Sequence, residues 1–390
     1  MATAIEAITT LLTLSGLAYL VIAVLGSRDF TRYWKRRTEK IDHHPDVTIL
    51  KPVKGVDQQM YAGLVSHCRQ KYSGNFEIIF GVSSLDDPAV AEIERLRAEF
   101  PGVAIRLVEC LERLGTSGKV SNLVQMLREA RYEYIVINDS DIRVSSLYLT
   151  HIMACFADPT VGMVTAPYIG RAAVKADKGT TLWSRLEALG ISTDFLPGVL
   201  TARKLEGGIR FGLGSTLATS KTILAKSGGL EPLVEYLADD YEMGERIAAT
   251  GYRVELCSEV VETTVPAYTF QEFREHQLRW SRSTRDSRKL GYLGLGITYA
   301  LPWAMMTCVA SGLALWSFSL LSVVVLARVG VALSVGVGIL GDGQVLRDIY
   351  LLPLRDLFGL FFWIWSFADD TVVWRGELFH LRDGRITPAR

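Results

Sequence analysis

The chain has 390 residues, 49% of them hydrophobic, and a positive mean hydropathy of +0.21. So apolar a composition excludes an ordinary soluble enzyme and places part of the chain in lipid. The 42 basic residues are balanced by 42 acidic ones, so the sequence lacks the basic excess that nucleic-acid binding requires, and no nucleic-acid partner is expected. The five cysteines are scattered, which argues against a disulfide framework or a zinc site and fits a reducing compartment.

The first predicted element is a membrane anchor within residues 1–27. Residues 5–26 are almost wholly apolar, and roughly 20 such residues span the hydrocarbon core as a helix. A cleaved signal peptide would carry its basic residues before the apolar run, whereas here they follow it. We therefore expect an uncleaved anchor, with the residues after 27 in the cytoplasm by the positive-inside rule. The basic residues on this flank are Arg28, Arg32, Lys35, Arg36 and Arg37.

Residues 46–290 are predicted to form a cytoplasmic α/β domain. Short β-branched runs alternate there with helical patterns, as in an open, mainly parallel sheet covered by helices. The predicted strands are 47–50, 77–82, 103–108 and 134–138, and the amphipathic segments are 88–99 and 119–130. Because ligands of such sheets bind beyond the carboxyl ends of the strands, the polar residues that follow each strand are candidates for function.

Two of these polar clusters are candidates for nucleotide binding. Asp86 and Asp87 precede Pro88 at a predicted helix start, where an acid can cap the helix or accept hydrogen bonds from a ribose or a base. Lys119 and Asn122 follow a glycine-containing segment at the start of the next helix. They can contact a nucleotide there or serve as a solvated cap.

A pair of carboxylates follows the apolar strand 134–137. Asp139 and Asp141 stand one residue apart at its end, and two such oxygen ligands can share one Mg²⁺ or Mn²⁺. A cation held there would bridge the two phosphates of a nucleoside-diphosphate sugar and stabilise the leaving diphosphate. A triplet of this kind also occurs in solvated turns, but the strand before it favours the metal-binding interpretation.

A second acidic pair, Asp239 and Asp240, opens a helical pattern that continues to Ile247. Acids are favoured in a first helical turn, so capping explains such a pair in many proteins. Two adjacent acids need not both be caps, however. A carboxylate at this edge could take the proton from an acceptor hydroxyl, and sugar transfer by direct displacement needs such a base.

The segment from His276 to Trp280 precedes the C-terminal apolar region. A basic amphipathic segment at the bilayer surface is one interpretation. Arg279 and Trp280 also suit a transferase, because Arg can grip a diphosphate and Trp can exclude water. Upstream, residues 180–203 carry an apolar stripe that ends before Pro197; core packing explains such a stripe, and contact with a lipid acceptor is our alternative.

Residues 291–370 are predicted to hold further membrane helices, and 371–390 a cytoplasmic tail. One apolar block, 301–341, is interrupted by Arg328 and could form a helical hairpin. The next, 345–368, contains Pro353 and paired charges, so it could be a full span or a kinked, re-entrant or interfacial helix. The tail is basic, which predicts an even number of crossings after residue 290. Its arginines are Arg375, Arg382, Arg385 and Arg390.

Taken together, these clusters resemble the ceramide glucosyltransferase family, glycosyltransferase family 21, over nearly the whole chain. The motifs that carry the resemblance are Asp86-Asp87-Pro88-Ala89, Asp139-Ser140-Asp141, Asp239-Asp240-Tyr241 and His276-x-x-Arg279-Trp280. Three further segments are similar to the bacterial branch associated with hopanoid biosynthesis, namely 119–123, 185–189 and 211–215. This ordered set is specific, although each motif alone is not.

The resemblance implies a GT-A fold, a UDP-sugar donor, Mg²⁺ or Mn²⁺, and inversion at the anomeric carbon. By position it assigns nucleotide contact to Asp86 or Asp87, metal and diphosphate contact to Asp139 and Asp141, and the base to Asp240, with Asp239 as a further candidate. Arg279 and Trp280 keep the roles of the last motif. His276 departs from the family, which usually has Gln or Arg there, and replaces a fixed group by one that titrates near neutral pH.

The function implied is transfer of a hexose, with UDP-glucose as the preferred donor, to a hydroxyl of a ceramide-like membrane lipid. The alternative is transfer of N-acetylglucosamine or a related sugar to a hopanoid such as bacteriohopanetetrol. A processive polysaccharide synthase is disfavoured, because the apolar segments are too few for a polymer channel. A catalytically silent membrane adaptor is disfavoured because all the carboxylates are present. The expected location is the bacterial inner membrane, with the catalytic domain facing the cytoplasm.

Overall fold

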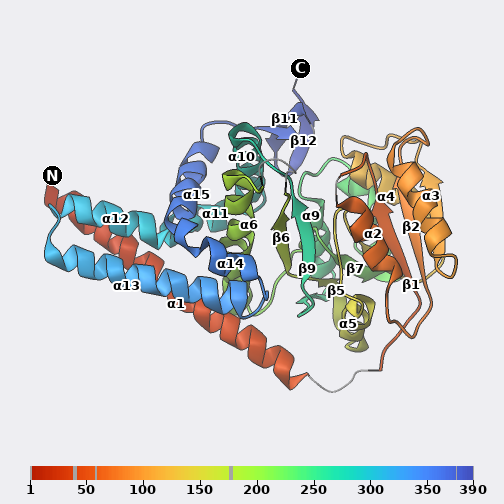
Figure 1. Cartoon of the computed structure of the whole chain (residues 1–390), viewed down its shortest axis with the longest axis horizontal. Helices are drawn as coiled ribbons and strands as arrows, with labels where there is room; N and C mark the ends of the chain where they lie inside the picture. The colour runs from red at the N-terminus through yellow and green to blue at the C-terminus, as the bar shows by residue number, and fades with distance from the viewer. Residues whose placement is uncertain (1, 38–41, 58, 175–178, 375, 390) are drawn as a thin grey trace.

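The computed structural model describes the whole chain except residues 1, 38–41, 58, 175–178, 375 and 390. Long helices lie on one side of the molecule and an α/β domain lies on the other (Figure 1). A layer of helices that includes α6, α10 and α15 separates the two parts. The long helices on the first side come from the N-terminal and C-terminal apolar segments.

The α/β domain is built on a seven-stranded sheet in the order β3-β2-β1-β4-β7-β5-β8. Its strands are β1 Val47–Pro52, β2 Phe76–Val82, β3 Ala104–Glu109, β4 Tyr134–Ile137, β5 Val161–Thr165, β7 Leu217–Ser220 and β8 Arg253–Leu256. Strand β7 runs antiparallel to both of its neighbours, and the other pairs are parallel. The predicted mixed, mainly parallel sheet is confirmed, and its strands are apolar because both faces are covered.

Helices pack beside this sheet, and the first four each follow one of the four strands that the sequence predicts. They are α2 Met60–Cys68, α3 Ala89–Glu99, α4 Gly118–Glu129, α5 Tyr148–Ala154, α8 Lys221–Lys226 and α9 Asp239–Ala249, with the short turns η1 Cys155–Ala157 and η3 Glu231–Leu233. The predicted segments 88–99 and 119–130 each match a helix within a residue. A separate parallel pair, β6 Tyr168–Ala172 and β9 Val261–Val265, lies beside the carboxyl end of the main sheet.

Three long helical segments pack together on the other side. They are α1 Ala2–Arg36, the bent pair α11 Lys289–Thr298 and α12 Ala300–Ala310, and α13 Leu315–Val331 with η4 Ala332–Val337. Helices α1 and α12 approach closely at Gly16, where an added Cβ would lie only 2.7 Å from Ala300. The hydroxyls of Thr13 and Thr307 on the same two helices are 3.2 Å apart. Small residues and shared hydroxyls are the usual means of helix contact in lipid. The predicted hairpin within 301–341 is confirmed.

The last apolar block is long enough to span a membrane, but its main helix runs in a different direction from the other long apolar helices. By length and composition, Ala4–Arg36, Leu315–Val337 and Gly343–Ser366 are long enough to cross a membrane, and the bent pair makes a fourth candidate. The third of these comprises α14 Gly343–Asp348, η5 Ile349–Leu351 and α15 Leu352–Ser366. In Figure 1 α15 runs across the direction of α12 and α13, which is the arrangement expected of an interfacial helix.

The layer between the two parts is held by aromatic side chains. Trp183 lies 5.6 Å from Phe273, and Phe273 lies 5.9 Å from Phe358, which joins α6 Leu182–Gly190, α10 Phe270–Ser287 and α15. Helix α6 continues through the π-helical turn η2 Ile191–Phe195 into α7 Leu196–Glu206. The helix thus continues beyond the apolar stripe and through Pro197, because the widened turn changes the hydrogen bonding where proline lacks its N–H.

The C-terminal tail is a small antiparallel sheet of β10 Thr371–Trp374, β11 Glu377–Arg382 and β12 Arg385–Pro388. It is attached to the segment before α9, where Leu237 N donates to Gly384 O at 3.0 Å and Ile386 N donates to Glu235 O at 2.8 Å. The tail therefore packs on the α/β domain, a contact that the sequence did not predict. Two of the tail's arginines, at positions 375 and 390, lie outside the described residues.

Candidate active site

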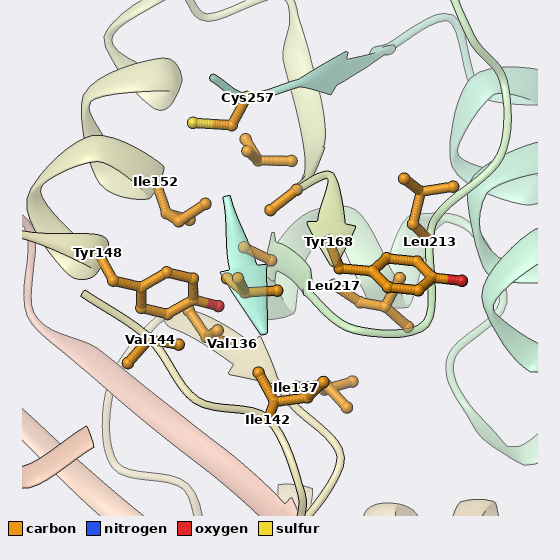
Figure 2. Close-up of a cluster of buried hydrophobic side chains, with 14 of the residues drawn as sticks. Val136, Ile137, Ile142, Val144, Tyr148, Ile152, Tyr168, Leu213, Leu217 and Cys257 are labelled. Carbon is orange, nitrogen blue, oxygen red and sulfur yellow. The ribbon is translucent and has the colours of Figure 1, made fainter. Parts of the chain in front are cut away.

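The turn that carries the first acidic pair is anchored in the core. Asn138 is fully buried, and its Nδ2 donates to Ser215 O at 2.7 Å and to the Tyr148 hydroxyl at 2.9 Å. Figure 2 shows Ile137 and Ile142, the apolar residues on either side of the turn, in one buried cluster with Tyr148. The turn is thus fixed at the carboxyl end of β4, as the sequence predicts.

The two carboxylates of this turn have different surroundings. Asp141 accepts hydrogen bonds from Thr263 Oγ1 at 2.5 Å and from Thr264 N at 3.3 Å, both on β9. Burial and the neighbouring Asp139 charge raise the pKa of Asp141. The Asp139 side chain is 41% exposed. Hydrogen bonds and Lys119 offset only part of the negative charge of Asp139 and Asp141, so this edge of the sheet attracts a cation.

Lys119 connects the two acidic pairs. Its Nζ lies 3.0 Å from Asp139 Oδ1 and 3.2 Å from Asp239 Oδ2. It stands in the first turn of α4, whose N-cap Ser117 accepts a hydrogen bond from Val120 N. Burial alone would lower the pKa of Lys119, but the charges of Asp139 and Asp239 outweigh burial and raise it. Residues 139 and 239 are therefore parts of one site.

Capping does not account for Asp240. The N-cap of α9 is Ala238, which makes no side-chain cap hydrogen bond, and Asp240 lies inside the first turn, where its Oδ1 accepts a hydrogen bond from the adjacent Tyr241 N at 2.8 Å. Burial and the adjacent Asp239 charge raise the pKa of Asp240 to about 6, against the lowering effect of Lys119. A carboxylate with a raised pKa is a stronger base, so the position suits general-base catalysis.

The first predicted nucleotide cluster is divided by the fold. Asp87 accepts hydrogen bonds from Gly55 N and Ala89 N, each at 2.9 Å, and so holds the loop after β1 to the start of α3. Asp86 is exposed on the same turn, which makes it the more accessible of the two acids. Asn122 is buried, and its Oδ1 accepts from Ser83 Oγ at 3.2 Å at the end of β2.

An aromatic chain links α10 to the carboxylates. The Trp280 ring lies 5.7 Å from Phe195, and Phe195 lies 5.4 Å from Tyr168. Burial, followed by the charges of Asp240 and Glu187, raises the pKa of Tyr168, so this tyrosine lies close to the acidic groups. Arg279, partly buried, and His276, whose ring is 5.3 Å from Trp280, are on the same helix.

Two residues near the acidic groups were not predicted from the sequence. Lys51 at the end of β1 is fully buried, and its Nζ donates to Asp139 O at 2.9 Å. Burial lowers its pKa to about 7, while the Asp141 and Asp139 charges oppose the change. A lysine directly after an apolar strand was a usable signal for Lys51. Tyr168 had no comparable signal, because its neighbours come from distant segments.

The acidic pair fits a divalent metal. Oxygen donors are the ligands that Mg²⁺ prefers, and one or two carboxylates with substrate phosphates complete many such sites. Within the described ranges, no group of three or more His, Cys, Asp or Glu side chains could hold a metal on its own. Asp139 and Asp141 are the side chains that would hold such an ion.

The chain is similar to known glycosyltransferases along nearly its whole length. The family model of glycosyl transferase family 21 matches residues 8–387. Ceramide glucosyltransferase 3 of Caenorhabditis elegans is 24% identical over 98% of this chain and 84% of its own length, and ceramide glucosyltransferase 1 of the same organism is 24% identical over 60% and 49%.

The fold is also that of solved glycosyltransferases. A mannosyltransferase from Pyrobaculum calidifontis, solved with GDP-Man and Mn²⁺, superposes with a TM-score of 0.51 at 19% identity, over 93% of this chain and 98% of the other. The GT-A fold expected from the sequence is confirmed. With the family match spanning nearly the whole chain, the protein belongs to glycosyl transferase family 21 and is a hexosyltransferase.

Proposed function

We propose that this hexosyltransferase moves a sugar from a UDP-sugar, with UDP-glucose as the preferred donor, to a hydroxyl of a ceramide-like membrane lipid, with inversion. The observation that carries the proposal is the Lys119 bridge, with 3.0 Å to Asp139 and 3.2 Å to Asp239. Lys119 joins Asp139, which we propose binds the donor, to Asp239, the sequence neighbour of the proposed base Asp240, and this supports a single site for donor binding and proton transfer. Relatives named as ceramide glucosyltransferases support the choice of donor and acceptor.

The residues have distinct tasks in this proposal. Asp139 and Asp141 would hold a divalent cation, which when bound neutralises the charge that develops on the leaving diphosphate. Asp240 would accept the proton of the acceptor hydroxyl as that oxygen attacks the anomeric carbon. Trp280 and Phe195 would restrict water, which otherwise competes with the lipid for the sugar.

The donor and acceptor can be identified in one assay. Purified protein with Mg²⁺ or Mn²⁺ should convert ceramide to a monoglycosylated product when offered UDP-glucose within a panel of UDP-sugars, ceramide, diacylglycerol and bacteriohopanetetrol, as read by lipid mass spectrometry. Glycosylation of bacteriohopanetetrol alone would replace the ceramide-like acceptor by a hopanoid. A water-soluble polymer would indicate a synthase, and the absence of any metal-dependent use of UDP-sugars would indicate a silent protein.

The membrane arrangement leads to a topology prediction. If α1, the α11–α12 pair and α13 cross and α14–α15 lies in the interface, two crossings follow residue 290 and both basic clusters face the cytoplasm. In intact cells we expect Leu315→Cys, at the exposed first residue of α13, to react with an impermeant thiol reagent. Arg382→Cys should react only after permeabilisation. Labelling of Arg382→Cys from outside would show that α14–α15 crosses.

A further inference from the structure

A buried glutamate outside the acidic pairs joins α6 to α10. The Glu187 side chain is 3% exposed, and its Oε2 accepts a hydrogen bond from Gln277 Nε2 at 2.5 Å. Its Oε1 lies 3.2 Å from His276 Nδ1, an ion-pair distance without the alignment of a hydrogen bond. Glu187 thus contacts two consecutive residues on α10, one turn before Arg279 and Trp280.

Helix α15 supplies a fixed positive charge to the same place. Arg355 Nη2 donates to Asp194 Oδ2 at 3.2 Å, and the guanidinium passes over Gly190, where a Cβ would lie 2.2 Å from its Nε. Positions 187, 190 and 194 follow the i, i+3, i+7 spacing of one helix face. Arg355 therefore lies along the face of α6 and η2 that carries Glu187, in space that only glycine at position 190 leaves open.

The charges around Glu187 keep it ionised. Burial alone raises the pKa of Glu187, but the nearby His276 side chain, the Arg355 charge and the hydrogen bond from Gln277 together lower it. Among the described residues, Nε and Nη1 of Arg355 have no hydrogen-bond partner, so the guanidinium acts on Glu187 by its charge. The ionised carboxylate therefore contacts α10 directly and interacts with Arg355 of α15 through charge, so the position of α10 is coupled to both α6 and α15.

We propose that Glu187 is a positioning residue for sugar transfer, which sets α10 over the donor site and links that helix to α15 at the membrane surface. This inference depends on the proposed roles of Arg279 and Trp280 in donor binding. In this proposal the aromatic contacts hold α6, α10 and α15 together, and the polar contacts of Glu187 set the position of α10. The aromatic packing can vary by small shifts, whereas a charge-assisted hydrogen bond is directional.

The test is Glu187→Gln, which keeps the shape and removes the charge. We expect the KM for the UDP-sugar to rise about tenfold, as for loss of a charged hydrogen bond. The KM for the lipid should be unchanged, and a larger fraction of donor should be hydrolysed by water. The matched control is Glu259→Gln, because Glu259 is also buried and pairs with a histidine, His151 of α5. Its kinetic constants should match those of the wild-type protein.

A purely structural role gives a different result. If Glu187 only stabilises the fold, Glu187→Gln lowers the maximal rate through loss of active protein and leaves both KM values unchanged, which would overturn the inference. Arg355→Gln leaves the carboxylates of Glu187 and Asp194 without this positive charge, so it should weaken donor binding. Adding Glu187→Gln removes one of these carboxylates and should restore part of the lost binding. Additive effects in this cycle would contradict the link between α15 and α10.

The inference and the proposed function fail in distinguishable ways. The affinity for UDP with Mn²⁺, read as a thermal shift on folded protein, reports on α10 even in a preparation that glycosylates no lipid. A wild-type protein without lipid glycosylation would refute the proposed acceptor. Equal UDP affinities of Glu187→Gln and the wild type would refute the positioning role.

Discussion

Asp240→Asn is expected to lower the rate of lipid glycosylation by about two to four orders of magnitude, the usual cost of losing a general base. Asparagine keeps the shape of the side chain, and its amide oxygen can still accept the hydrogen bond that Asp240 Oδ1 receives from Tyr241 N. It cannot take a proton at neutral pH. The affinity for UDP should change little, because the proposed diphosphate contacts are Asp139 and Asp141. Initial rates with saturating donor and lipid, beside UDP titration, measure both quantities.

Asp239→Asn is the matched comparison for Asp240→Asn. It removes the charge of one of the two carboxylates that contact Lys119 Nζ, the one at 3.2 Å. The other carboxylate, Asp139, stays at 3.0 Å from Nζ. We expect a smaller loss of rate than for Asp240→Asn, accompanied by weaker donor binding. If Asp239→Asn is inactive while Asp240→Asn transfers sugar normally, the base is Asp239. If both variants stay active, the base lies elsewhere in the protein.

Asp141→Ala should reduce activity by at least about a hundredfold, because a metal ion contributes several kcal/mol of charge stabilisation to the leaving diphosphate. The variant also loses the hydrogen bonds from Thr263 and Thr264, so its thermal stability must be compared with that of the wild type. The measurement is turnover against Mn²⁺ or Mg²⁺ concentration after chelation and dialysis. Near-normal turnover of the dialysed variant would show that the acidic pair is only a solvated turn.

Asp46→Ala is a suitable control for the metal experiment. Asp46 precedes β1, at the opposite end of that strand from Lys51, and its carboxylate accepts a hydrogen bond from Asn75 N at 2.9 Å. Removing it deletes a carboxylate with a backbone partner without touching the acidic pairs. Its metal dependence should match that of the wild-type protein. A shift equal to that of Asp141→Ala would mean that loss of any such carboxylate disturbs the fold.

The amino-acid sequence by itself determined the elements and the edge of the sheet where the site lies. Apolar runs of strand length predicted β1 to β4, and helical spacing predicted α3 and α4, because local burial patterns follow the backbone period. The positions of Asp139 and Asp240 after predicted strands and turns followed from the same patterns. The apolar N-terminal run predicted α1, because length and hydropathy alone decide whether a helix can cross lipid.

Only the tertiary structure decided which side chains meet. The Lys119 contacts with Asp139 and Asp239, and the Glu187 contacts with α10, join residues 20 to 120 positions apart. The sequence also did not predict that Asp87 accepts a hydrogen bond from the backbone N–H of Gly55. Nor did it predict that the C-terminal tail is hydrogen-bonded to residues 235–237. The direction of α15 was open too, since one composition suits both a span and an interfacial helix. Partner choice depends on distances set by the packing of distant segments, which local patterns do not contain.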